Sequence, residues 1–143
     1  MLDNLPSLSQ TVDIHGLRAN KSLGQHFLLD MNVTDKIARL AAPLGGVNVA
    51  EIGPGPGGLT RALIQNGAQV LAIEMDERFL APLDDIARAS GKLDVIQADG
   101  LKVDIAEHLS GEIKLSPTCP IMLARKCSLI GSRRGPYFGA KLC

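Results

Sequence analysis

Apolar residues in the middle of the chain alternate between short segments rich in apolar residues and runs with helical spacing. The short segments predict strands of a parallel sheet, and these strands are expected at 47–52, 69–73, 93–98 and 113–115. Apolar residues spaced three and four apart predict helices, and these helices are expected at 59–66, 76–90 and 103–109. The alternation predicts an α/β fold, in which a parallel sheet has helices on both faces and right-handed crossovers.

The part of the chain before the first strand has a weaker pattern. Residues 1–20 are polar, with no clear period, and are interpreted as an arm without a regular element. Residues 21–30, with the sequence KSLGQHFLLD, predict an ordered loop that docks on the domain. A helix is expected from Asn32, which can cap it, because Val33 and Ile37 begin an apolar face that continues to Ala41.

Glycines and acidic residues follow the ends of the predicted strands. Gly53 opens the glycine-rich turn GPGPGG, Glu74 closes the second strand, and Asp99 follows the third. Because the carboxyl ends of parallel strands share one edge of a sheet, these residues are expected to meet where open α/β sheets bind ligands. Each alone is as well explained by a turn or a helix cap, but their occurrence at three successive strand ends favours a cofactor site.

The residue types indicate which cofactor this site binds. Glu74 can accept hydrogen bonds from both hydroxyls of a ribose, and Asp99 can accept one from an adenine amine. Glu51, two residues before Gly53, can either orient the turn or meet an amino-acid ammonium group. A ligand with an amino acid, a ribose and an adenine, and no pyrophosphate, is S-adenosylmethionine. The spacing Gly53-x-Gly55-x-x-Gly58 alone also fits an NAD-type dinucleotide-binding module.

Charge and cysteine are unevenly distributed. Residues 1–113 hold nine Lys and Arg against fifteen Asp and Glu, a net charge of −6, whereas 114–143 hold six Lys and Arg and no acid. All three cysteines lie in this last part, in no zinc-binding pattern. The change indicates either a basic RNA-contacting tail or a segment foreign to the domain before it. With no long apolar run and no secretory signal, the chain is expected to be cytoplasmic.

Four segments of the chain resemble the small-subunit ribosomal RNA adenine N6-dimethyltransferase family: KSLGQHFLLD, AEIGPGPGGLT, AIEMD and QADGL. The resemblance covers about residues 15–115 and implies an incomplete Rossmann-like S-adenosylmethionine-dependent methyltransferase fold. It implies N6-dimethylation of adenosines in small-subunit ribosomal RNA, with S-adenosylmethionine as cofactor, no metal, no membrane and a monomeric protein. The residues that it implies for cofactor binding are His26, Leu28, Gly53, Glu74 and Asp99.

The resemblance also implies an Asn-Leu-Pro-Tyr segment at the end of the fourth strand, where the target amine is held. Nothing after Leu115 matches it, so no catalytic residue is assigned. The expected organisation is an arm at 1–20, a partial methyltransferase domain at 21–115 and a divergent basic tail at 116–143. A shifted reading frame is one hypothesis for the tail. The chain is therefore interpreted as an enzyme by descent or as a non-catalytic remnant that binds the cofactor.

The expected RNA contacts lie in the arm and the loop that follows it, and not in the tail. They are His15, Arg18, Lys21 and His26.

Overall fold

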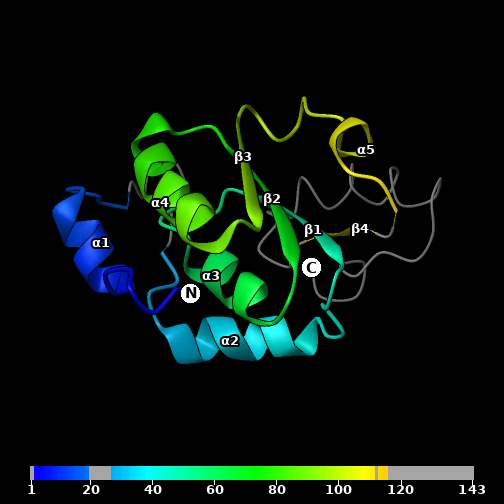
Figure 1. Ribbon diagram of the computed structural model, residues 1–143. Helices are drawn as coiled ribbons and strands as arrows, with labels where there is room; N and C mark the ends of the chain where they lie inside the picture. Colours follow the sequence, from blue (N-terminus) through cyan, green and yellow to red (C-terminus); the bar gives the residue numbers. More distant parts are fainter. Residues whose placement is uncertain (1, 20–26, 112, 116–143) are drawn as a thin grey trace.

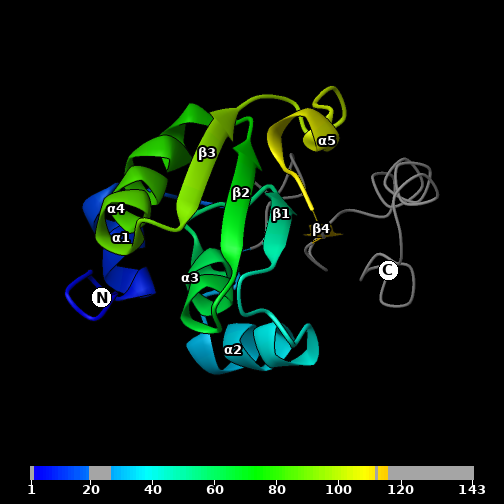
Figure 2. The ribbon, with the colours of Figure 1, turned by 45° about the vertical axis from the view of Figure 1, so that its right-hand side comes forward.

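The computed structural model describes residues 2–19, 27–111 and 113–115, and these residues form an α/β fold around a parallel sheet (Figures 1 and 2). The strands are β1 (Asn48–Ile52), β2 (Gln69–Glu74), β3 (Leu93–Gln97) and β4 (Ile113–Leu115). Their order in the sheet is β3-β2-β1-β4, and every neighbouring pair is parallel. The fold class and the positions of the four strands predicted from the sequence are confirmed. The predicted tail at 116–143 lies outside the described residues.

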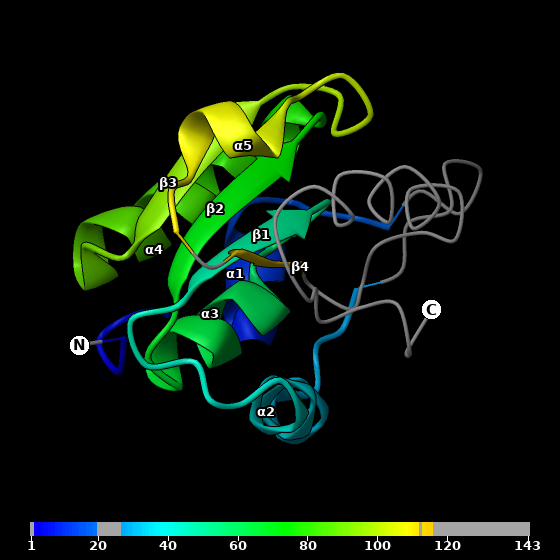
Figure 3. The same ribbon diagram turned by 90° about the vertical axis from the view of Figure 1, so that its right-hand side faces the viewer.

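Helices lie on both faces of the sheet, as Figure 3 shows. They are α1 (Leu8–Ile14), α2 (Met31–Leu40), α3 (Gly58–Gln65), α4 (Leu80–Ser90) and α5 (Ile105–His108), with a 3-10 turn, η2 (Glu77–Phe79), before α4. α3 and α4 pack on one face, α2 packs against α3, and α5 lies on the opposite face. Each crossover therefore returns the chain to the same end of the sheet, and the carboxyl ends of the strands share one edge.

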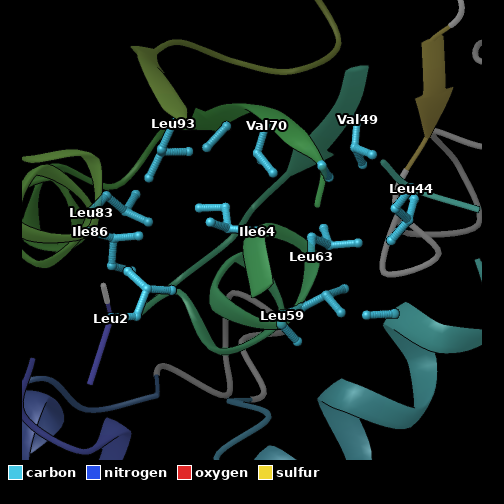
Figure 4. Close-up of a cluster of buried hydrophobic side chains, with 14 of the residues drawn as sticks. Leu2, Leu44, Val49, Leu59, Leu63, Ile64, Val70, Leu83, Ile86 and Leu93 are labelled. Carbon is cyan, nitrogen blue, oxygen red and sulfur yellow. The ribbon is translucent and has the colours of Figure 1, made fainter. Parts of the chain in front are cut away.

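The hydrophobic core has one part on each face of the sheet, because successive side chains of a strand point to opposite faces. The larger part lies between the sheet and α3 and α4 (Figure 4), and it includes Val49, Val70, Leu63, Leu83, Ile86 and Leu93. The smaller part lies under α5, and it consists of Ala50, Leu71, Ile73, Ile105, Ile113 and Leu115.

The first twenty residues differ from the sequence prediction, because residues 8–14 form α1. Ser7 caps this helix: its hydroxyl accepts from the backbone N–H of Gln10 at 3.2 Å, and the Gln10 side chain accepts from the backbone N–H of Ser7 at 2.9 Å. This reciprocal pair is a capping box. The side chains of Leu2, Leu8 and Leu17 are buried. The interpretation of this segment as an arm without a regular element is therefore wrong.

The cap of α2 also differs from the expectation. Asp30, not Asn32, is the N-cap residue, and its carboxylate accepts the backbone N–H of Asn32 at 2.9 Å. A cap side chain accepts from an amide two or three positions into the helix, so the helix begins two residues earlier than predicted.

Candidate functional site

The glycine-rich turn joins β1 to α3 and is fixed to the neighbouring strand. The amide of Gly53 donates to the carbonyl of Ile73 on β2 at 2.9 Å. Gly53, Gly55 and Gly57 have φ of +69°, +57° and +90°, a region that residues with a side chain rarely adopt. A Cβ built at Gly53 would meet nothing within 4 Å, and Gly53 is exposed. The backbone of the turn is therefore open to a ligand at Gly53.

The other end of the turn is packed closely. A Cβ at Gly57 would lie under 3.0 Å from the end of the Ile86 side chain, and one at Gly58 would lie under 3.0 Å from the carbonyl oxygen of Leu28. Glycine is needed here for close packing, whereas at Gly53 it leaves open space. The turn therefore has an open side and a buried side.

Glu74 links β2 to the glycine turn. Its side chain is 6% exposed, and one carboxylate oxygen accepts the amide of Gly55 at 3.1 Å while the other accepts the amide of Asp76 at 2.9 Å. Each carboxylate oxygen can accept about two hydrogen bonds, so both retain acceptor capacity for a ligand. The structure places Glu74 at the predicted edge of the sheet, in direct contact with the turn that begins at Gly53.

Glu51 lies beneath the same turn and is 1% exposed. One carboxyl oxygen accepts the hydroxyl proton of Thr60, on α3, at 2.6 Å. The pKa of Glu51 is raised from 4.5 to about 7: burial is the largest cause, the Thr60 hydrogen bond acts against it, and the charge of Glu74 adds to it. The contact with Thr60 ties β1 to the first turn of α3, which supports the orienting role among the two alternatives for Glu51. The other alternative, contact with an ammonium group, stays a prediction.

Asp99 follows β3, two residues beyond its last strand residue, and is partly buried. Its carboxylate accepts the amide of Leu101 at 2.9 Å, and the Leu101 side chain is 43% exposed. A Cβ at Gly100 would lie 2.6 Å from the Ile52 side chain, so the segment after β3 packs against the end of β1. Asp99 is therefore held near the same edge as Gly53 and Glu74.

Among the residues of the predicted docking loop, 27–30 are described and His26 lies outside the described residues. The Phe27 ring reaches the glycine turn, 3.8 Å from the position of a Cβ on Gly55. It also packs edge-on against Phe79 of η2, with 5.5 Å between ring centroids. The Leu28 side chain is 39% exposed, and its carbonyl oxygen abuts Gly58. Phe27 and Leu28 thus lie against the glycine turn, a location that the sequence pattern alone did not predict for the loop.

Several residues at this edge were missed by the sequence prediction. Thr60 and Phe27 hold the turn from two sides, and Met75, which follows Glu74 directly, is 68% exposed. A large apolar side chain between two acids, in the sequence IEMD, is a signal that could have identified Met75. Nothing in the sequence marks Thr60 apart from its place in the first turn of α3.

In residues 2–19, 27–111 and 113–115, no group of three or more His, Cys, Asp or Glu side chains is arranged to hold a metal ion. No helix in this part of the chain has the length and apolar content to cross a membrane.

Comparison with solved structures shows a shared fold. The chain superposes on a 23S ribosomal RNA methyltransferase, ErmE, with a TM-score of 0.61 and 24% identity, over 78% of this chain and 45% of that one. It superposes on a dimethyladenosine transferase from Plasmodium falciparum with a TM-score of 0.59 and 23% identity, over 79% of this chain and 40% of that one. At these identities the likeness concerns the fold alone, and it is the Rossmann-like methyltransferase fold.

Comparison of sequences gives the family. The chain is 55% identical over 112 residues to the ribosomal RNA small subunit methyltransferase A of Azorhizobium caulinodans, covering 77% of this chain and 38% of that protein. It is 53% identical over 121 residues to the protein of the same name from a Ruegeria species, covering 83% of this chain and 43% of that protein. The chain thus spans less than half the length of these curated relatives. The family model for ribosomal RNA adenine dimethylase matches residues 16–124, and the chain belongs to this family.

Proposed function

We propose that this chain binds S-adenosylmethionine and forms the cofactor-binding part of an enzyme that dimethylates adenosine N6 in small-subunit ribosomal RNA. The observation that carries the proposal is the position of Glu74, a buried carboxylate at the end of β2 that is hydrogen-bonded to the glycine turn. The family and the names of the relatives support the reaction and the substrate class.

The residues present fit the cofactor. Glu74 has lone pairs left to accept the two ribose hydroxyls, and the open backbone at Gly53 leaves space for the methionine part. The exposed side chains of Met75 and Leu101 offer apolar contact to the adenine ring, and the Asp99 carboxylate can accept from its amine. Contact between Glu51 and the ammonium group stays a prediction, because Glu51 is 1% exposed beneath the turn. The cofactor supplies an electrophilic methyl group on a sulfonium.

The leucine and histidine of the docking loop complete the proposed cofactor contacts. Leu28 is exposed beside the glycine turn, and we propose that it makes an apolar contact with the cofactor. The contact proposed for His26, through its ring or a backbone polar group, rests on the family resemblance.

The site of methyl transfer is a separate question, because the amine of the target adenine must be held in line with the methyl group. No asparagine occurs after Leu115, and no Asn-Leu-Pro-Tyr segment follows β4. This observation favours a second candidate function, in which the chain binds the cofactor without turnover.

Among the proposed RNA contacts, His15 and Arg18 are described. The His15 imidazole lies 3.8 Å from the Asp85 carboxylate on α4, and the carbonyl of Arg18 accepts from Arg78 at 3.4 Å. Both residues are exposed, but the His15 imidazole lies beside an acid, so Arg18 is the better candidate for a phosphate contact. The division into an arm at 1–20, a domain at 21–115 and a tail at 116–143 stays a prediction, as do the monomeric state and the cytoplasmic location.

Ligand-dependent thermal unfolding tests the cofactor. S-adenosylhomocysteine and NADH are each titrated against the full chain, and the unfolding temperature is followed by circular dichroism. A ligand that binds the folded state alone raises the unfolding temperature with its concentration. We expect protection by S-adenosylhomocysteine and none by NADH; the reverse would replace the methyltransferase proposal with a dinucleotide-binding module.

Methyl incorporation distinguishes the two candidate functions. Small ribosomal subunits that lack the modification are incubated with the chain and radiolabelled S-adenosylmethionine. Incorporation at the level of the same mixture without protein is expected for a binding protein without turnover. Incorporation into adenosine N6 well above that level would show a complete enzyme.

A further inference from the structure

The N-terminal segment is packed into the core of the domain. Leu2, Leu8 and Leu17 are 7%, 2% and 4% exposed, and Leu2 and Leu17 belong to the same cluster as the buried side chains of α3 and α4. Figure 4 shows Leu2 on the side of the cluster that Leu83 and Ile86 of α4 form. The segment from Leu2 to Leu17, called the strap below, therefore gains its order from contacts with α3 and α4.

Arg61 of α3 holds the strap by hydrogen bonds. Its guanidinium donates to the carbonyl of Pro6 at 2.7 Å and to the hydroxyl of Thr11 at 3.1 Å. The residue is 7% exposed, its Nε has no hydrogen-bond partner within the described residues, and burial lowers the pKa of the guanidinium. A buried cation is costly unless it is hydrogen-bonded, so the two acceptors of the strap satisfy a group that α3 leaves unsatisfied.

The strap and residues 27–30, called the covering loop below, meet at one residue of α3. A Cβ at Gly58, the first residue of α3, would lie 2.8 Å from the Leu8 side chain and under 3.0 Å from the carbonyl oxygen of Leu28. The amide of Arg61 donates to the carbonyl of Gly57 at 3.0 Å, so Arg61 stands one turn further along the same helix. The strap, the covering loop and the glycine turn therefore share the first turn of α3.

A second connection runs through η2. The carbonyl of Arg18, the residue after the strap, accepts from Arg78 at 3.4 Å, and the ring of Phe27 packs on Phe79, the next residue. Arg18, directly after the strap, and Phe27, at the start of the covering loop, are thus both held by η2. Displacement of the strap removes the Leu8 side chain from Gly58, which the Leu28 carbonyl also approaches, and disturbs the acceptor that Arg18 offers to Arg78 beside Phe79.

We propose that Arg61 is a positioning residue that locks the strap, and that the docked strap holds Phe27 and Leu28 over the glycine turn, so that docking of the strap is coupled to cofactor binding. This inference rests on the proposed function, because it assumes a cofactor at the glycine turn. If the strap must be docked for binding, the apparent dissociation constant equals the intrinsic one divided by the docked fraction. Coupling of two equilibria is reciprocal, so the cofactor must in turn hold the strap.

Hydrogen exchange followed by mass spectrometry tests this reciprocity in the unchanged full chain. Saturating S-adenosylhomocysteine should slow exchange of the α1 amides, although α1 is not part of the proposed cofactor site. Unchanged exchange of α1 in a chain that binds the ligand would overturn the coupling. If the chain does not bind the ligand, the proposed function fails instead, and the link between the strap and residues 27–30 is tested by hydrogen exchange of the variant below without ligand.

The double variant Leu8→Ala with Thr11→Val releases the strap while leaving Arg61 and the cofactor residues intact. We expect faster exchange at α1 and at 27–30, and a dissociation constant for S-adenosylhomocysteine raised by about tenfold if one strap in ten stays docked. The control is Ile14→Ala, on the same helix but 67% exposed, which should change neither. Arg61→Lys, which keeps a donor for Pro6 but loses the fork, should give an intermediate affinity.

Two results would contradict the proposal. In the first, α1 exchanges freely in the double variant but both the exchange of 27–30 and the ligand affinity equal those of the unchanged chain; the strap then contributes stability alone. In the second, Arg61→Lys binds as weakly as the double variant while its α1 stays protected, which would mean that Arg61 acts on the ligand without the strap.

Discussion

Substitution of Glu51 by Gln tests whether the buried carboxyl beneath the glycine turn makes folding depend on pH. Glu51 is 1% exposed and hydrogen-bonded to Thr60, and its pKa in the folded chain is about 7 against an ordinary 4.5. Between these two values the unfolded chain has released the proton and the folded chain keeps it. The free energy of unfolding therefore falls as the pH rises through this window.

The magnitude follows from the two pKa values. Each tenfold change in proton affinity is worth about 1.4 kcal/mol, so ionisation of Glu51 costs about 3 kcal/mol of folding stability once the pH exceeds 7. The contribution of the protonated group is fully present below pH 4.5 and is lost as the pH rises through 7. Glutamine has nearly the same shape, can still accept from Thr60, and does not titrate.

Urea unfolding followed by circular dichroism at pH 4 to 8.5 measures the effect. The stability of Glu51→Gln relative to the unchanged chain should rise by about 3 kcal/mol across this range. Glu77→Gln, an exposed acid on η2, is the control and should show no such rise. A difference between the Glu51 variant and the unchanged chain that stays constant with pH would refute the argument from burial.

Two further substitutions address the packing around the site. Gly58→Ala should weaken S-adenosylhomocysteine binding, measured by calorimetry, by about tenfold, because the new Cβ pushes against the backbone of Leu28 rather than a flexible side chain. The control is Gly45→Ala, where a Cβ meets nothing within 4 Å and binding should be normal. Equal binding by the two variants would contradict the close packing at Gly58. Asp30→Ala should lower the free energy of unfolding, measured in urea, by about 1 kcal/mol, because the backbone N–H of Asn32 loses its acceptor at the start of α2. An unchanged free energy of unfolding would show that the cap adds nothing to stability.

The two inner strands of the sheet, β1 and β2, were predictable from the sequence because they are buried on both faces. An apolar run such as 70–73 leaves little choice of element, and Glu74 directly follows it. Because the strands are parallel, their carboxyl ends lie at one edge, and this can be predicted without knowing any side-chain contact. The positions of Glu74 and Asp99 at this edge follow from topology alone.

The N-terminal helix was not predicted because its stability comes from tertiary contacts. α1 has seven residues, which is too short to be stable alone, and its apolar residues are too few to form a clear face. The capping box of Ser7 and Gln10 was a local signal that could have been read. The bonds from Arg61 to Pro6 and Thr11 join residues about fifty positions apart, and no local pattern predicts them.

The two roles considered for Glu51 could not be separated from the sequence for a similar reason. Its position before the glycine turn shows that it is near the site, but its state depends on burial and on Thr60, which lies on a different element. A charged residue in an apolar segment indicates a specific role, but the sequence does not show whether that role is structural or ligand-binding.

Isothermal calorimetry with S-adenosylhomocysteine most directly tests whether the buried carboxylate of Glu74 grips the cofactor at the glycine turn. The unchanged chain should bind with measurable heat, Glu74→Ala should bind at least about tenfold more weakly, and Glu77→Ala, an exposed acid three residues further on, should bind as the unchanged chain does. Circular dichroism before each titration establishes that the variants are folded. Absence of heat from the folded, unchanged chain, or equal affinity for the Glu74 variant, would contradict the proposed cofactor site.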